Sequence, residues 1–244
     1  MNNVAVVTGA ARGIGAAVTR TLATRLGMHV LALDLDEQVH AEHEDSGMVT
    51  SAVADAADEN ELRAAVERVT ATLGPPTVGV ANAGIQRDER LGQLSTHDWD
   101  QVLRVDLTAA FLLARLLWPA MVDAGGGRLV ALSSIAKDGN FGQANYAAAK
   151  SGLVGLARTA AIEGGRHGIT ANIVCPGVID TPGTRAFAER APGAFERFVS
   201  RVPARRTGTA QEVADAVAFL CGPTAAYVSG QVLYVDGGLS SGQT

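Results

Sequence analysis

The sequence predicts an α/β protein whose doubly wound, seven-stranded parallel sheet carries helices on both faces. Short runs rich in β-branched residues alternate with longer amphipathic segments along all 244 residues. The short runs are almost wholly apolar, as expected for strands that are buried on both sides. Alternation of this kind implies right-handed crossovers between parallel strands. Because no linker, repeat or low-complexity tract interrupts the pattern, we expect one domain that spans residues 1–244.

Each strand is predicted at a short run that is rich in apolar and β-branched residues. In chain order these runs are residues 4–7, 29–33, 49–54, 78–81, 128–132, 169–174 and 232–235. Between them, apolar residues recur at the spacing of an amphipathic helix. This periodicity predicts helices at residues 16–26, 59–73, 99–122 and 144–166.

Composition limits the partners of the chain. A net charge of −5 and a pI near 5.5 give no electrostatic reason to expect nucleic acid or an anionic membrane. The N-terminus has no basic segment before an apolar one. The longest apolar stretch, residues 109–120, contains Arg115 and is too short to span a bilayer. We therefore expect a soluble cytoplasmic protein that binds neither nucleic acid nor membrane.

The cysteines and histidines indicate neither a disulfide framework nor a metal site. Cys175 and Cys221 lie in apolar surroundings, which favours buried, reduced thiols. The five histidines show no metal-binding spacing, and His40 and His43 fall in a polar segment that we interpret as a loop.

Three glycines, Gly9, Gly13 and Gly15, lie where the first strand turns into a helix. Glycine allows close approaches that a β-carbon would block, so a pyrophosphate can rest on the helix N-terminus. Such a loop can also be a mere tight turn. The strand before it, the helix after it and Asp34, nineteen residues beyond Gly15, favour a Rossmann-type dinucleotide site.

Asp34 ends the second predicted strand, where its carboxylate can accept hydrogen bonds from the adenosine ribose. A 2′-phosphate there would meet a like charge, at a cost of roughly 4 kcal/mol for a 4 Å separation and an effective dielectric near 20. Arg12 could offset this repulsion, and Asp36 is read as a solvated helix cap. We therefore expect NAD(H) to be preferred over NADP(H).

Tyr146 and Lys150 stand one turn apart on a predicted helix, so an ammonium can lie beside a phenol. A free phenol has a pKa of about 10, and a neighbouring cation lowers the pKa of such a group. Taken alone, the pair could be a solvated surface contact. Together with the glycine loop, it predicts an acid/base that moves the hydroxyl proton of an alcohol or ketone while a nicotinamide exchanges the hydride.

The motifs together resemble those of the short-chain dehydrogenase/reductase family. They appear in the family's order and spacing, as Thr8–Gly15, Asn82-Ala83-Gly84, Ser134, Tyr146, Lys150 and Pro176-Gly177. The resemblance extends over essentially the whole chain, through residues 235–238. Residues 140–146 look most like the 3-oxoacyl-(acyl carrier protein) reductase group. The resemblance implies a single-domain Rossmann fold.

The resemblance also assigns residues to the cofactor. Asp55 and Ala56 should flank the adenine, and the Asn82-Ala83-Gly84 backbone should face the ribose. Pro176, Gly177, Ile179 and Thr181 should hold the nicotinamide carboxamide. The remaining expected contacts are Gly9, Arg12, Gly13, Ile14, Gly15, Asp34, Tyr146 and Lys150.

By the same resemblance, a serine that closes the fifth strand polarises the substrate oxygen. The family serine usually lies thirteen residues before the tyrosine, a spacing that Ser133 has, whereas Ser134 is one residue closer. Counting along the strand from Gly127 favours Ser134, with a shortened loop after it. Ser133 remains the alternative for this role. Whichever serine does not polarise the substrate is expected to cap the end of the strand.

Asp106 stands where relatives have an asparagine that supports a proton relay, largely through its backbone carbonyl. An aspartate keeps that carbonyl, so the relay could survive unchanged. Alternatively, the added charge could raise the pKa of Lys150 and weaken its effect on Tyr146.

Substrate specificity in this family lies in the segment that here spans residues 182–206. Phe187, Phe195 and Phe198 could line a pocket or pack on the core. Where acyl-carrier reductases have basic residues, this chain has Gly125 and His167, with only Arg166 nearby. We therefore favour an NAD(H)-linked oxidoreductase of a secondary alcohol or ketone. The alternatives are an NADPH-dependent 3-oxoacyl-thioester reductase and a non-catalytic nucleotide-sensing or scaffold protein.

The family also implies a homotetramer. The apolar helix predicted at 99–122 and the last strand carry more apolar surface than one subunit needs. By resemblance, both lie in two perpendicular two-fold interfaces.

Overall fold

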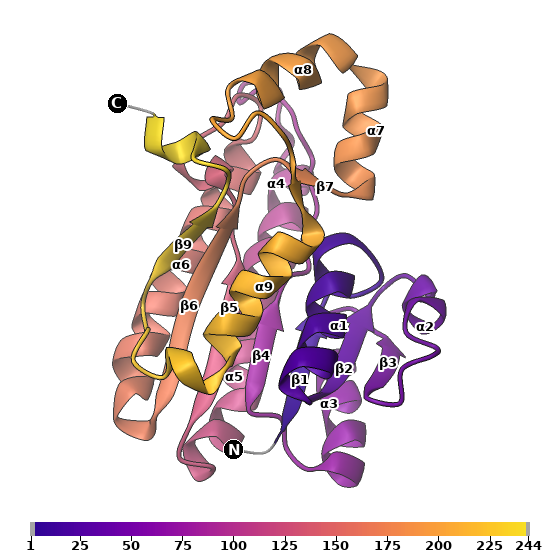
Figure 1. The fold of residues 1–244 in the computed structure, drawn as a ribbon, viewed down its shortest axis with the longest axis vertical. Coiled ribbons are helices and arrows are strands. Elements are labelled where there is room, and N and C mark those ends of the chain that lie inside the picture. Colours follow the sequence, from indigo (N-terminus) through magenta and orange to yellow (C-terminus); the bar gives the residue numbers. More distant parts are fainter. Residues whose placement is uncertain (1–2, 243–244) are drawn as a thin grey trace.

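Seven parallel strands form one sheet in the order β3-β2-β1-β4-β5-β6-β9, which confirms the predicted fold class (Figure 1). The computed structural model describes residues 3–242. The strands are β1 (Val4–Thr8), β2 (His29–Asp34), β3 (Val49–Val53), β4 (Val78–Ala81), β5 (Gly127–Leu132), β6 (Ile169–Pro176) and β9 (Val232–Val235). Each lies within two residues of its predicted bounds.

Helices cover both faces of this sheet. Val4 and Val6 of β1 face the core under α3 (Glu59–Leu73), α5 (Ala109–Asp123) and α6 (Ala144–Gly164). Ala5 and Val7, which alternate with them, face the core under α1 (Gly13–Leu26) and α9 (Ala210–Cys221). Alternate residues of one strand therefore contribute to two different cores. This explains why the strands have no polar face.

The helix predicted at 99–122 is divided by a π-helical turn. It begins as α4 (Thr96–Leu103), passes through the π turn Arg104–Thr108 and continues as α5. A π turn has i→i+5 hydrogen bonds and is often found at functional sites. Apolar periodicity did not reveal this irregularity. Asp106 lies within the turn and is 2% exposed.

This helical run is the one stretch of the described chain that is long and apolar enough to cross a membrane by length and composition. It spans Thr96–Asp123 with a mean hydropathy of 1.6. Core helices of soluble proteins have the same properties. Here Leu113, Leu117 and Met121 are fully buried in the core that covers the sheet, and Arg115 pairs with Glu59 of α3.

The polar segment around His40 was wrongly read as a loop. It contains a short helix, α2 (Gln38–Glu42), whose Val39 is fully buried. His43 follows this helix and is only 5% exposed, with Nε2 at 3.0 Å from the carbonyl oxygen of Ala10. The polar composition hid this packing, because one buried valine and one buried histidine hold the segment against the glycine loop.

Both cysteines are buried and free, as predicted. Burial raises the pKa of the Cys221 thiol to about 12.

Residues 182–206 form two helices above the carboxyl end of the sheet, α7 (Pro182–Arg190) and α8 (Pro192–Ser200) (Figure 1). A two-residue pairing of β7 (Ile179–Asp180) with β8 (Gly208–Thr209) closes the base of this segment. Phe195 and Phe198 pack on a small apolar cluster, whereas Phe187 is 39% exposed. Two of the three phenylalanines therefore pack on the core, which was one of the two predicted alternatives.

Candidate active site

A cavity of about 820 Å³ opens at the carboxyl ends of the strands. It lies where the strand order reverses between β1 and β4, the usual ligand site of a doubly wound sheet. The structure brings almost all predicted site residues to its wall. They are Gly9, Arg12, Gly13, Ile14, Asp34, Asp55, Ala56, Asn82, Ala83, Gly84, Ser134, Tyr146, Lys150, Pro176, Gly177, Ile179 and Thr181. Gly15 and Asp106 are not part of the wall, and both are buried.

The glycine loop leaves the N-terminus of α1 accessible to the cavity. Gly9 and Gly13 have φ angles of +68° and +57°, which favour glycine. A β-carbon on Gly15 would lie 2.0 Å from the carbonyl oxygen of Gly9. The close turn therefore requires glycine, and the free backbone N–H groups at the start of α1 suit a phosphate.

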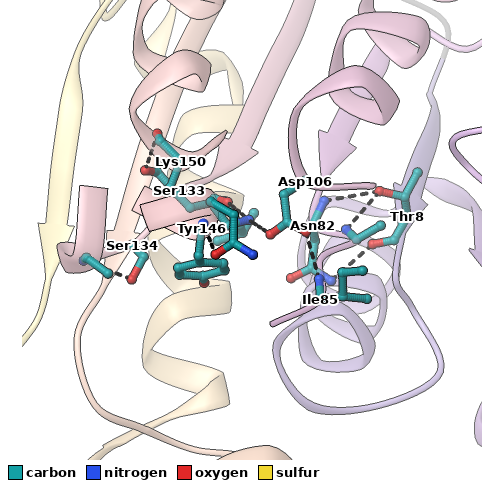
Figure 2. Close-up of polar contacts among 12 residues, drawn as sticks. Thr8, Asn82, Ile85, Asp106, Ser133, Ser134, Tyr146 and Lys150 are labelled. Atoms are coloured by element: carbon teal, nitrogen blue, oxygen red, sulfur yellow. Dashed lines mark hydrogen bonds and ion pairs between the residues drawn. The ribbon is translucent and has the colours of Figure 1, made fainter. Parts of the chain in front are cut away.

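Asn82 ties this loop to β4. Its Nδ2 donates hydrogen bonds to the carbonyl oxygens of Thr8, at 3.0 Å, and Gly9, at 2.8 Å (Figure 2). The Thr8 hydroxyl in turn accepts from the backbone N–H groups of Asn82 and Ala83, both at 3.1 Å. Sequence reasoning assigned no role to Thr8, although it stands directly before the first glycine.

Asp34 lies at the end of β2, beside the loop. One carboxylate oxygen accepts from the Ala11 N–H at 2.9 Å, and the other accepts from the Asp36 N–H at 3.0 Å. Arg12 is paired with Asp36 at 2.8 Å rather than with Asp34. Asp36 also accepts from the Gln38 N–H at 3.0 Å, although Glu37 holds the N-cap position of α2. Sequence reasoning missed the contact of Asp36 with Arg12.

Asp55 and Ala56 lie on the cavity wall beyond β3. The Asp55 carboxylate pairs with Arg104 at the start of the π turn and accepts from the Ala57 N–H at 2.8 Å. The expected adenine contact would therefore be made by a loop that is already anchored by a charge pair.

Tyr146 and Lys150 both belong to α6, and both line the cavity. Lys150 Nζ lies 5.4 Å from the centroid of the Tyr146 ring. Lys150 is only 3% exposed, and its Nζ donates to the Leu132 carbonyl oxygen at 3.0 Å. The ammonium is therefore fixed by the end of β5 while it faces the phenol.

Asp106 meets Lys150 from the π turn. Its Oδ2 lies 3.1 Å from Nζ, and its Oδ1 accepts from the Ile85 N–H at 2.8 Å (Figure 2). Burial alone would lower the pKa of Lys150, but Asp106 and, to a lesser degree, Tyr146 outweigh burial and raise it. Burial raises the pKa of Asp106, against the attraction of Lys150. The Asp106 side chain thus takes part in this site.

The two serines at the end of β5 have different surroundings. Ser133 is 4% exposed, and its hydroxyl donates to the Lys150 carbonyl oxygen at 2.8 Å. The Ser134 hydroxyl accepts from the Ala136 N–H at 3.1 Å and is partly exposed at the cavity. Because the Ser133 hydroxyl proton is already donated to the backbone, Ser134 is the better candidate to polarise a substrate oxygen.

The predicted nicotinamide end lies between β6 and α7. Thr181 caps α7, with its hydroxyl accepting from the Thr184 N–H at 3.3 Å. A β-carbon on Gly177 would lie 2.7 Å from the Asp236 Cα, so this close approach also needs glycine.

The loop before α4 and the loop before α6 are bonded to each other. The Glu89 N–H donates to the Gly142 carbonyl oxygen at 2.8 Å, and Gln143 Nε2 donates to the Asp88 carboxylate at 2.9 Å. Phe141 is 81% exposed between these contacts.

Comparisons with known proteins agree with this geometry. A family model described as enoyl-(acyl carrier protein) reductase matches residues 9–240. The 3-oxoacyl-[acyl-carrier-protein] reductase FabG of Escherichia coli (strain K12) is 37% identical, covering 97% of this chain and 96% of its own. The (3R)-3-hydroxyacyl-CoA dehydrogenase of Canis lupus familiaris is 39% identical, covering 96% and 95%.

Two solved structures are similar over nearly their whole length. A levodione reductase has a TM-score of 0.91 at 32% identity, covering 99% of both chains. A putative NAD(P)-dependent gluconate 5-dehydrogenase from Beutenbergia cavernae, solved with bound NADP at low occupancy, has a TM-score of 0.89 at 36% identity, covering 98% of this chain and 97% of its own.

Proposed function

The chain belongs to the short-chain dehydrogenase/reductase family of oxidoreductases, and on this basis we propose that it interconverts a secondary alcohol and a ketone with NAD(H) as preferred cofactor. The observation that carries the proposal is the convergence of Ser134, Tyr146 and Lys150 on the cavity that also contains the glycine loop. A proton carrier and a dinucleotide cradle therefore share one space.

The roles follow from the contacts. Tyr146 donates its phenolic proton to a ketone oxygen, or accepts one from an alcohol. Ser134 donates a hydrogen bond to the same oxygen and stabilises its developing charge. The Lys150 ammonium stabilises the phenolate. A bound nicotinamide supplies or accepts the hydride. Lys150 and Ser133 have little contact with solvent, because both side chains are buried.

The residues present fit a pyridine dinucleotide. The glycine loop can fold tightly against Gly9 and Asn82 only because Gly15 lacks a β-carbon. Asp34 supports the preference for NAD(H), since each of its oxygens has a further lone pair for a ribose hydroxyl. Arg12 is engaged by Asp36, which reduces its capacity to bind a 2′-phosphate.

A second candidate is an NADPH-dependent reductase of 3-oxoacyl thioesters. The names of the FabG and 3-hydroxyacyl-CoA relatives favour this substrate class, and one structural neighbour was solved with NADP. Against it, the two positions that match the carrier-binding basic residues are Gly125 and His167, and only Arg166, exposed beside His167, lies nearby. The relatives named as reductases and dehydrogenases, and the presence of Ser134, Tyr146 and Lys150, argue against a non-catalytic scaffold.

A substrate panel tests the proposal. Purified protein is assayed with ketones, secondary alcohols and 3-oxoacyl thioesters, each with NADH or NADPH and their oxidised forms. We expect turnover of a simple ketone or alcohol with the NAD pair, lost in Tyr146→Phe. Thioester turnover with NADPH alone would establish the second candidate instead, and inactivity on every pair would overturn both.

A further inference from the structure

The Lys150 ammonium is in direct contact with a buried carboxylate. Asp106 and Lys150 have side chains that are 0% and 4% exposed, and the Oδ2–Nζ distance is 3.1 Å. Within residues 3–242, no other hydrogen-bond partner meets this Oδ2. The second oxygen is held by the Ile85 N–H at 2.8 Å. The carboxylate therefore has a defined position between the π turn and the segment after β4.

Gly84 makes room for this pair. A β-carbon there would lie 2.8 Å from Asp106 Oδ2 and 3.2 Å from Lys150 Nζ. Three separate elements therefore meet at the contact: the π turn with Asp106, α6 with Lys150 and the segment after β4 with Gly84. The ion pair is part of the local packing rather than a mobile surface contact.

The other groups that face Lys150 are formally neutral. The phenol of Tyr146 is on the same helix, the thiol of Cys175 comes from β6, and the Leu132 carbonyl comes from β5. Burial raises the pKa of Cys175, which keeps that thiol protonated. Among the described residues, Asp106 is thus the group that places a formal negative charge against the ammonium.

We propose that Asp106 is a positioning residue whose carboxylate holds Lys150 by a direct ion pair and offsets part of the charge that Lys150 presents to Tyr146. Inside a buried site, solvent screens such an effect only weakly. The consequence is that less positive charge acts on the Tyr146 phenol than Lys150 alone would supply. The protonated phenol is the form that donates to a ketone, so the carboxylate favours reduction near neutral pH. This consequence for turnover rests on the proposed function.

A phenolate titration tests the charge effect without substrate. The chain has three tyrosines, Tyr146, Tyr227 and Tyr234. Absorbance of the full-length protein is recorded against pH, and the same curve from a matched Tyr146→Phe variant is subtracted to isolate Tyr146. We expect Asp106→Asn, which is nearly isosteric, to lower the Tyr146 midpoint by about one pH unit. Lys150→Met should raise the midpoint.

Controls separate charge from structure. Asp215→Asn removes a carboxylate from an exposed pair with Arg25 and should leave the Tyr146 midpoint unchanged. Asp106→Ser removes the same buried charge with a different shape, so it should shift the midpoint in the same direction even where Asp106→Asn folds poorly. The alkaline rise of alcohol oxidation should move with the titration midpoint.

An unchanged or raised midpoint in both Asp106 variants would overturn the proposal. A raised midpoint would mean that Lys150 needs the carboxylate to stay charged. Loss of rate at every pH without a shift would indicate a merely structural role. A lowered midpoint in a protein that turns over no alcohol or ketone would support the ion-pair inference while the proposed function failed.

Discussion

Lys150 is held by two oxygens, one from the Leu132 carbonyl and one from Asp106, so its position relative to Tyr146 is set by β5 and the π turn together. A buried ammonium without such partners would lose much of its charge. At the scale of single residues, the chemistry of Tyr146 therefore depends on groups that do not contact the substrate.

Tyr146→Phe keeps the ring but removes the exchangeable proton. We expect turnover to fall by at least the roughly 10²–10⁴-fold that is typical of a general acid/base, with NADH affinity little changed. Steady-state kinetics and fluorescence titration with NADH measure the two quantities. Tyr227→Phe, at a fully exposed position, is the matched control. A Tyr146→Phe enzyme that kept more than about a tenth of the wild-type rate would contradict the assignment.

Asp34 is expected to set the cofactor preference. The like-charge cost estimated above corresponds to a preference for NAD(H) near 10³-fold. Asp34→Ser should reduce that ratio chiefly by improving the kcat/KM for NADP(H). Asp45→Ser, in the exposed segment after α2, serves as the control. Equal use of both cofactors by the unmodified chain would show that Arg12 leaves Asp36 to bind the 2′-phosphate.

At the scale of elements, threonines cap the helices on both sides of residues 182–206. Thr181, on the cavity wall, caps α7, and Thr209, at the end of β8, caps α9. The second cap is a capping box, in which Thr209 and Glu212 each bond the backbone of the other. Arg206 pairs with Glu212 and lowers the pKa of that carboxyl to about 2.

This capping box should contribute to stability in a pH-dependent way. Thr209→Ala should lower the free energy of unfolding at neutral pH by about 1 kcal/mol. Because the pKa of Glu212 is about 2 in the folded protein and ordinarily 4.5, its contribution is full above the ordinary value. That contribution is lost as the pH falls through the folded value. The stability difference between wild type and Glu212→Gln should therefore shrink below about pH 4.5.

Urea denaturation at several pH values measures these differences. Thr207→Ala, at a threonine outside the box, is the control. A Glu212→Gln difference that stayed constant down to the acid limit of folding would argue against the ionised Glu212 carboxylate as its source.

For the whole molecule, the remaining question is assembly. Phe111 on α5 and Ile162 on α6 are 42% and 82% exposed on one side of the protein, and Leu233 and Tyr234 on β9 are 37% and 36% exposed at the sheet edge. An edge strand also leaves backbone groups open to pairing. These two surfaces correspond to the two interfaces that the sequence resemblance implies.

We therefore predict a homotetramer of about four times 25.1 kDa. Light scattering coupled to size exclusion at micromolar concentration measures the mass. Ile162→Glu should break one interface and give a dimer, because a charge would be buried there. Arg158 is exposed on the same helix, so Arg158→Glu shows whether a change of charge alone converts the tetramer to a dimer. An active monomer would refute the assembly, and a stable wild-type dimer would leave one interface.

Local chemistry could be predicted from the sequence because it depends on neighbours along the chain. The seven strands follow from apolar runs, and the glycine loop and the Tyr146–Lys150 pair follow from spacing within one turn or one loop. These patterns extend over only a few residues, so they can be recognised along the sequence. The helix α2 and the π turn were missed because each is stabilised by contacts with segments that are distant in the sequence.

What the sequence by itself determined is the fold class, the position of the glycine loop and the placement of Tyr146 and Lys150 one turn apart on a helix. What only the tertiary structure decided is which charged side chains form ion pairs within the site. Asp106 precedes Lys150 by more than forty residues, and Arg12 precedes Asp36 by twenty-four, yet both pairs are in contact. Electrostatic interaction depends on distance in space and on burial. Both are set only when the sheet brings the carboxyl ends of its strands together.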